Sequence, residues 1–100
     1  MEYEILSDDA IIEVLENHPR WLLSEDKKTL RCVYKFKNFI QAMSFMNACA
    51  TFAEEINHHP NWSNVYNKVD VNLTTHSEKG LTNLDADMVD FMDKAFKRLI

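Results

Sequence analysis

The run from Asn38 to His59, NFIQAMSFMNACATFAEEINHH, constrains the fold most, because its apolar residues recur with helical spacing and no glycine or proline interrupts it. Between Phe39 and Ile56, 12 of 18 positions are apolar, whereas packing on one sheet face needs an apolar stripe only about 100° wide. The run therefore predicts one long helix, with Asn38 as its N-cap and with apolar surface to spare. Its two apolar stripes are Phe39, Met43, Met46, Ala50 and Ala53, and Ala42, Phe45, Cys49, Phe52 and Ile56.

Two explanations remain open for the surplus apolar surface of this helix. Small alanines spread around a well-covered helix would account for it, and so would a second buried face at a subunit interface. The chain has only 100 residues and buries about two-thirds of its unfolded surface, so association with another copy would add stability. The subunit interface is therefore favoured.

Alternating apolar and polar residues on both sides of the long helix predict β-strands. In residues 29–36, TLRCVYKF, one parity is apolar, and a shorter strand over residues 20–23 precedes it across the polar turn SEDKK. After Pro60, NWSNVY and VDVNLTTH predict a second hairpin that turns near residues 67–68. Val69, Val71, Leu73 and Thr75 point to one side of its second strand, which His76 ends.

Capping signals define two further helices. Ser7 precedes the acidic start of a short helix over residues 8–17, which Pro19 ends, and His18 is assigned to the helix end or the surface. Gly80, the only glycine, lies in the turn SEKG and is expected to need a positive φ. The sequence from Thr82 to Asp85 resembles a capping box. It opens a last helix whose inward residues are Leu84, Met88, Phe91, Ala95 and Leu99.

The order of elements is therefore α-β-β-α-β-β-α. Short polar hairpins favour a four-stranded antiparallel sheet, with the two long helices packed on one face as a two-layer α+β sandwich. A chain of this length is expected to form a single domain over residues 1–100.

Composition excludes several classes of function. The formal net charge is −5 and no cluster of Lys or Arg exceeds two neighbours, so direct binding of nucleic acid lacks its electrostatic driving force. The longest uncharged stretch, residues 38–53, is too polar to span a membrane, and the N-terminus does not resemble a signal peptide. The two cysteines show no CxxC spacing, which favours the reducing cytoplasm over a disulfide framework.

The stretch EEINHHPNW places two histidines where the long helix stops, and it is the best candidate for acid/base chemistry. Glu54 precedes His58 by four residues, a spacing that favours contact between them, whereas His59 is rotated by about 100° on a helix. If the following hairpin packs beside this helix end, His76 and Asp85 join the same cleft.

Simpler explanations exist for each of these residues. A histidine at a helix C-terminus also stabilises the helix dipole, and Asp85 also fits a purely structural cap. Trp21 and Trp62, taken singly, are more often core residues than ligand-stacking groups.

Metal and thiol chemistry are less well supported. Three histidines could bind one zinc ion, but structural zinc usually takes four Cys or His ligands, the adjacent pair His58-His59 diverges and the HExxH pattern is absent, so no metal is expected. Cys32 and Cys49 fall inside a predicted strand and helix without a nearby charge to activate a thiolate.

The spacing Glu54-x3-His58-His59-Pro60-x5-Tyr66-x9-His76-x8-Asp85 resembles the signature of the pterin-4a-carbinolamine dehydratases, also known as dimerisation cofactors of a homeodomain transcription factor. The segments FKNFIQAMSFM, NHHPNWSNVYNKV, TTH and GLT resemble the family in the same order, and the likeness covers about residues 8–96. Two positions depart from the animal relatives, which carry Asp at Asn57 and Cys at Glu78.

The resemblance implies a hydro-lyase, a 4a-hydroxytetrahydrobiopterin dehydratase. Such an enzyme converts 4a-hydroxytetrahydropterin to quinonoid dihydropterin and so recycles the pterin used by aromatic amino acid hydroxylases. His58, His59 and His76 would be the catalytic set, with His58 and His76 transferring protons and His59 holding the pterin. Glu54 would orient His58, Asp85 would orient His76, and Trp21 and Trp62 would wall the cleft.

The resemblance also bears on partners. No cofactor is required, a homo-oligomer (dimer or tetramer) is expected, and an aromatic amino acid hydroxylase would act in the same pathway. The alternative is a protein-binding coactivator or dimerisation module that uses the surplus apolar helix face without essential catalysis.

Overall fold

The computed structural model describes residues 3–100 and contains the predicted order of helices and strands. The chain forms α1 (Asp8–Asn17), β1 (Leu22–Leu23), β2 (Leu30–Lys35), α2 (Phe39–Ile56), β3 (Asn61–Val65), β4 (Lys68–Leu73), the short 3₁₀ helix η1 (His76–Glu78) and α3 (Asn83–Leu99). The fold is thus an α+β arrangement of helix-strand-strand-helix-strand-strand-helix, as the sequence predicted.

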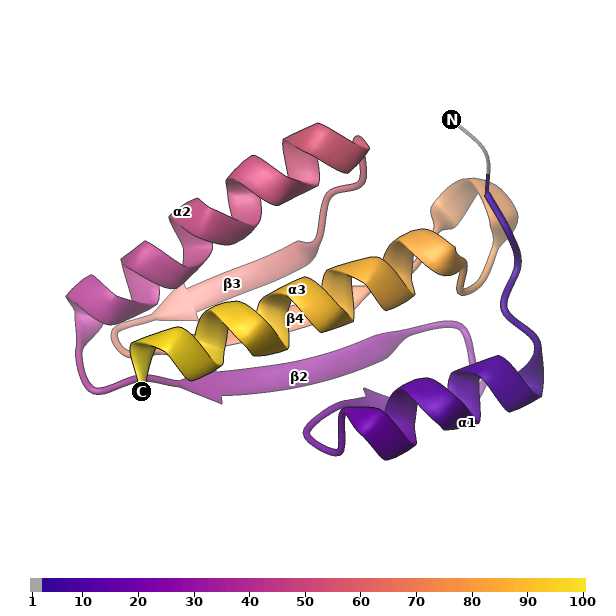
Figure 1. The fold of residues 1–100 in the computed structure, drawn as a ribbon, viewed down its shortest axis with the longest axis horizontal. Coiled ribbons are helices and arrows are strands. Elements are labelled where there is room, and N and C mark those ends of the chain that lie inside the picture. The colour runs from indigo at the N-terminus through magenta and orange to yellow at the C-terminus, as the bar shows by residue number, and fades with distance from the viewer. Residues whose placement is uncertain (1–2) are drawn as a thin grey trace.

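The four strands form one antiparallel sheet in the order β1-β2-β4-β3, so β2 and β4 lie at its centre. Cys32 pairs with Val71 and Tyr34 with Val69, which places the apolar parities of both central strands on the same face. Figure 1 shows α2 and α3 running across that face, with α1 beside the lower edge of the sheet. The other face carries polar residues such as Arg31 and Asp70, which form an ion pair.

Side-chain caps start α1, α2 and α3, as expected from the sequence. Ser7 accepts a hydrogen bond from the Ala10 amide and Asn38 accepts one from the Gln41 amide. Thr82 and Asp85 form the predicted capping box at the start of α3. Each cap satisfies amides that the first turn of a helix leaves without partners, and this fixes where the helix begins.

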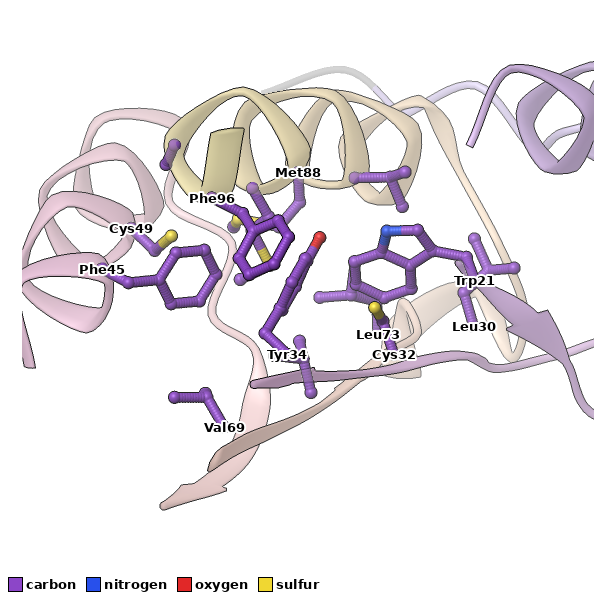
Figure 2. Packing of buried hydrophobic residues seen from close by; sticks show 14 of the residues in the cluster. Trp21, Leu30, Cys32, Tyr34, Phe45, Cys49, Val69, Leu73, Met88 and Phe96 are labelled. Carbon is purple, nitrogen blue, oxygen red and sulfur yellow. The ribbon is translucent and has the colours of Figure 1, made fainter. Parts of the chain in front are cut away.

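The hydrophobic core lies between the sheet and the two long helices, with Tyr34 at its centre. The Tyr34 ring lies 4.8 Å from that of Phe45 on α2 and 4.9 Å from that of Phe96 on α3, measured between ring centroids. Figure 2 shows these rings meeting between the layers. On α2 the fully buried residues are Ala42, Phe45, Cys49 and Ala53, so mainly the second predicted stripe faces the core.

A buried carboxylate on α3 ties the N-terminal segment to the core. Asp93 accepts hydrogen bonds from the Tyr34 hydroxyl (2.5 Å), the Trp21 indole nitrogen (3.2 Å) and Nδ1 of His18 (2.7 Å). In Figure 2 the Tyr34 hydroxyl and the Trp21 nitrogen both point away from the sheet, toward α3. Burial and the bond to Asp93 raise the pKa of Tyr34, which keeps its hydroxyl protonated as a donor. His18 is the C-cap of α1, which confirms its assignment to a helix end, and its partner Asp93, 75 residues away, could not be seen from spacing along the helix.

Local details of the hairpins differ from the prediction. The β3-β4 turn lies at Tyr66 and Asn67, one residue earlier than expected, and Tyr66 has a positive φ of 52°. β4 ends at Leu73, so His76 begins η1 instead of closing the strand. Phe39, at 44% exposure, and Ile40, at 71%, leave apolar surface on α2 open in the single chain.

The expectation of a positive φ at Gly80 was wrong. Gly80 forms an antiparallel β-bridge with Thr75 and has no positive φ, and Lys79, with φ 55°, takes the left-handed conformation that closes the turn. A Cβ atom at Gly80 would meet only the Glu78 carbonyl oxygen, at 4.0 Å. The turn therefore depends on the conformation of residue 79 and leaves room for a side chain at residue 80.

Replacing Asp93 with alanine is expected to lower the free energy of unfolding by about 3–5 kcal/mol, because three donors lose their buried acceptor. Asp90→Ala is the matched control on the same helix, since Asp90 is 52% exposed, pairs with Lys94 at 3.0 Å and lies 3.8 Å from His18, whereas Asp93 holds His18 at 2.7 Å. It should cost about 0.5 kcal/mol. Urea denaturation followed by circular dichroism measures both, and equal losses would contradict the special role of Asp93.

Gly80→Ala is expected to leave the free energy of unfolding unchanged or to raise it by up to about 1 kcal/mol, because alanine restricts the unfolded chain without a clash in the folded one. Lys79→Val should lower it by about 1–2 kcal/mol, because a β-branched residue is strained at a positive φ. Thermal and urea unfolding of the two variants give the comparison. A larger loss for Gly80→Ala would contradict the extended backbone at that position.

Candidate active site

The end of α2 sends the two neighbouring histidines in different directions. Asn57 closes the helix in the left-handed conformation, with φ 51° and ψ 47°, and asparagine tolerates this conformation better than most residues. The next amide, that of His58, returns to the Ala53 carbonyl oxygen at 3.0 Å. As a result the side chain of His58 is only 10% exposed, whereas that of His59 is 57% exposed.

His58 binds a fully buried carboxylate on α3. Its Nε2 lies 2.6 Å from Oδ1 of Asp85, whose side chain has no exposed surface. The other oxygen, Oδ2, accepts the Thr75 hydroxyl at 2.7 Å and the Thr82 amide at 3.0 Å. This carboxylate joins the end of α2, the segment after β4 and the first turn of α3. The arrangement orients one imidazole in a largely dry environment, where a histidine can exchange protons with a bound molecule.

The second histidine has a different acid as its partner. Nε2 of His59 lies 2.5 Å from Oε2 of Glu54, and both side chains are exposed. The sequence had paired Glu54 with His58 and Asp85 with His76, and both pairings were wrong. The helical spacing from Glu54 to His58 is broken because α2 ends at Ile56 and Asn57 reverses the backbone.

The backbone places His76 beside this cluster. It directly follows Thr75, the residue that binds Asp85, and it is exposed at the start of η1. Thr75 also holds the loop that carries His76, because its carbonyl oxygen accepts the Glu78 amide at 3.0 Å and its amide donates to the Gly80 carbonyl oxygen at 2.8 Å.

The two tryptophans have different positions. Trp62 is half-buried at the start of β3, four residues after His58, and packs against the core. Trp21 is only 2% exposed and donates to Asp93, so it offers no ring face to a ligand. The expectation that Trp21 walls the cleft was therefore wrong, because the tertiary fold uses its indole in the core.

The cysteines offer no reactive thiol. Burial raises the pKa of Cys32 to about 12, with a contribution from Asp93, and burial raises the pKa of Cys49 to about 12. Within residues 3–100, no three His, Cys, Asp or Glu side chains converge closely enough to hold a metal ion. No helix in that described part of the chain is both long and apolar enough to cross a lipid bilayer.

The sequence did not identify Thr75, Thr82 and Asn57 as parts of this site. One signal was available, since the alternation in β4 put Thr75 on the inward parity with Val69, Val71 and Leu73, where a hydroxyl needs a hydrogen-bonding partner.

Known proteins resemble this chain over nearly its whole length. The pterin 4 alpha carbinolamine dehydratase family matches residues 4–95. A Sinorhizobium fredii protein named pterin-4-alpha-carbinolamine dehydratase is 48% identical over 95 residues, which cover 95% of this chain and 90% of the relative. A Prochlorococcus marinus protein of the same name is 40% identical over 90 residues, which cover 90% and 93%.

A solved structure agrees with these relatives. The crystal structure of a Brucella melitensis protein described as a transcriptional coactivator/pterin dehydratase has a TM-score of 0.86 and 38% sequence identity, and the match covers 92% of this chain and 98% of that one. The chain therefore belongs to the pterin-4a-carbinolamine dehydratase family.

Asp85→Ala is expected to lower the free energy of unfolding by about 3 kcal/mol or more, because His58, Thr75 and the Thr82 amide lose a buried acceptor. Glu54→Ala is the matched control, since it removes the carboxylate partner of the other histidine at an exposed position. It should cost about 0.5 kcal/mol or less. Urea unfolding of both variants tests the difference, and a cost for Glu54→Ala as large as that for Asp85→Ala would contradict it.

Proposed function

We propose that this protein dehydrates 4a-hydroxytetrahydropterin to quinonoid dihydropterin by histidine general acid/base catalysis. The observation that carries the proposal is the burial of His58 against Asp85, next to the loop that presents His76. Membership of the family supports the reaction class. His58, His59 and His76, which stand at the spacing of the family signature, support catalysis by histidine.

The reaction explains why histidines are suited to this site. The C4a–O bond breaks, the departing hydroxide takes a proton from an acid, and a base removes the proton from ring N5 as the N5–C4a double bond forms. Hydroxide is a poor leaving group, so a positioned acid accelerates the step, typically by about 10² to 10⁴-fold. Imidazole has an ordinary pKa of about 6.5, so it can donate or accept a proton near neutral pH.

We assign proton transfer to His58 and His76 and contact with the pterin to His59. Asp85 orients His58, a role that replaces the pairing expected from the sequence. Glu54 supports His59, and Trp62 is the remaining aromatic candidate for one wall of the cleft.

The biological setting follows from the reaction. A pterin dehydratase of this kind would recycle the cofactor of an aromatic amino acid hydroxylase in the cytoplasm, which the two unpaired cysteines also favour. We further propose a homo-oligomer, a dimer or tetramer, that covers the apolar surface left on α2.

One observation favours a second function, that of a protein-binding coactivator module. A groove between α2 and α3 is lined by Ser44, Ala48, Phe91 and Leu99, together with the cations Lys94 and Arg98. An amphipathic helix from a partner would fit such a groove. A chain that binds a helical partner but does not dehydrate the pterin would favour this module over the enzyme.

His76→Ala is expected to reduce the rate of dehydration by about tenfold or more while the fold stays intact, because the imidazole is exposed on η1 and supplies a proton-transfer group. Stopped-flow absorbance of the 4a-carbinolamine, with and without protein, measures the rate directly. Circular dichroism checks the fold.

The exposed Lys79, on the same loop, supplies the control, because Lys79→Asn removes a charge and keeps a residue that tolerates a positive φ. It should retain the wild-type rate. Unchanged turnover in His76→Ala would remove His76 from the mechanism, and a wild-type protein that does not accelerate the reaction would refute the proposed function itself.

A further inference from the structure

Thr75 lies between the two histidines to which we assign proton transfer, although no acid/base chemistry is expected of threonine. It is 3% exposed, and its hydroxyl oxygen lies 2.7 Å from Oδ2 of Asp85 and 2.8 Å from Oγ1 of Thr82. Its backbone closes the loop that carries His76. One residue therefore contacts the carboxylate that holds His58 and fixes the segment that holds His76.

The hydrogen-bond directions in this cluster follow from the number of protons available. A carboxylate only accepts, so the single hydroxyl hydrogen of Thr75 goes to Asp85. Thr82 must then donate the hydrogen bond between the two threonine hydroxyls. The hydroxyl oxygen of Thr82 in turn accepts a hydrogen bond from the Leu84 amide at 3.3 Å. Successive hydrogen bonds therefore connect the Leu84 amide to Thr82, Thr82 to Thr75, and Thr75 to Oδ2 of Asp85.

These hydrogen bonds occupy one oxygen of Asp85 and leave the other, Oδ1, to bind His58. Oδ2 already accepts the Thr75 hydroxyl and the Thr82 amide, and Oδ1 accepts Nε2–H of His58 at 2.6 Å. In its neutral form the ring then carries its hydrogen on Nε2 and keeps the lone pair on Nδ1. Nδ1 is thus the nitrogen free to take a proton from a substrate.

We infer that Thr75 is a positioning residue for the proposed reaction: its hydroxyl locks the Asp85 carboxylate in the orientation that holds Nε2–H of His58 and leaves Nδ1 as the proton acceptor. The inference rests on the proposed dehydratase function, because it assigns Thr75 a role through His58. Thr75 is nearly fully buried, and the inference assigns its effect on the reaction to the hydroxyl group.

Thr75→Val tests the inference, because it keeps the shape of the side chain and removes the donor. We expect kcat for 4a-carbinolamine dehydration to fall about five- to tenfold with less than about a twofold change in KM, since substrate contacts are retained. Thr75→Ser should restore kcat to within about twofold of wild type, because it returns the hydroxyl.

A spectroscopic readout separates positioning from simple loss of stability. The short bond to Asp85 should give the Nε2 proton of His58 a downfield ¹H resonance that exchanges slowly with water. His58→Gln identifies that resonance by removing it. We expect the signal in wild type and Thr75→Ser, and we expect it to shift upfield or broaden in Thr75→Val.

Thr74→Val is the matched control, because it deletes a neighbouring hydroxyl that donates to the Lys28 carbonyl oxygen at 2.6 Å and does not touch Asp85. It should leave both kcat and the His58 resonance unchanged. If Thr75→Val does not fold, Thr75→Ser and Thr75→Ala provide a second pair that differs by the hydroxyl alone. The lower kcat and the shifted resonance should then appear only in Thr75→Ala.

Two results would overturn the inference: a wild-type kcat in the folded variants that lack the hydroxyl, or an unchanged His58 resonance in those variants. Failure of the proposed function is distinguishable, because there the wild-type protein itself would not accelerate dehydration. The resonance comparison does not depend on turnover.

Discussion

The candidate site depends on the hydrogen bonds made by the buried carboxylate of Asp85. This carboxylate caps α3 through the Thr82 amide, anchors the segment after β4 through Thr75, and holds His58 at the end of α2. An unpaired carboxylate inside a protein is strongly unfavourable, so all three donors must be in place when the chain folds. The hydrogen bonds that the Asp85 carboxylate needs therefore hold the end of α2, the segment after β4 and the start of α3 together around the His58 ring.

A second buried acid on the same helix organises the other half of the core. Asp93 lies eight residues after Asp85 in the chain and accepts donors from Tyr34, Trp21 and His18. Residues eight apart share a helix face, so both acids point inward. Met88 and Met92, which lie between the two acids in the sequence, are fully buried in the hydrophobic core. The helix thus combines hydrophobic packing with two polar attachments, one to the N-terminal segment and one to the candidate active site.

The separation of His58 from His59 links the fold to the proposed chemistry. The left-handed Asn57 ends the helix before the two histidines, and the chain beyond it buries the ring of His58 and leaves that of His59 exposed. A buried, oriented imidazole and an exposed one suit the different tasks that we propose for them, proton transfer and contact with a ligand. The departure from the animal relatives at Asn57 keeps a residue type that tolerates this conformation.

The sequence by itself determined the elements, their caps and the faces of the strands. Ser7, Asn38 and the Thr82–Asp85 box act within one helical turn, and the alternation in β2 and β4 acts between neighbours, so these signals are readable locally. The sequence also selected the candidate histidines, through the pair at the end of the long helix and the spacing that resembles the family, and their catalytic roles are a proposal. Only the tertiary structure decided which acid holds which histidine, that Trp21 and His18 serve Asp93, and that Gly80 is extended. His58 and Asp85 are 27 residues apart, and His18 and Asp93 are 75 apart. Such partners meet only after the helices pack on the sheet. Which partner a side chain binds depends on distances in the folded chain and on burial, and the local sequence contains neither.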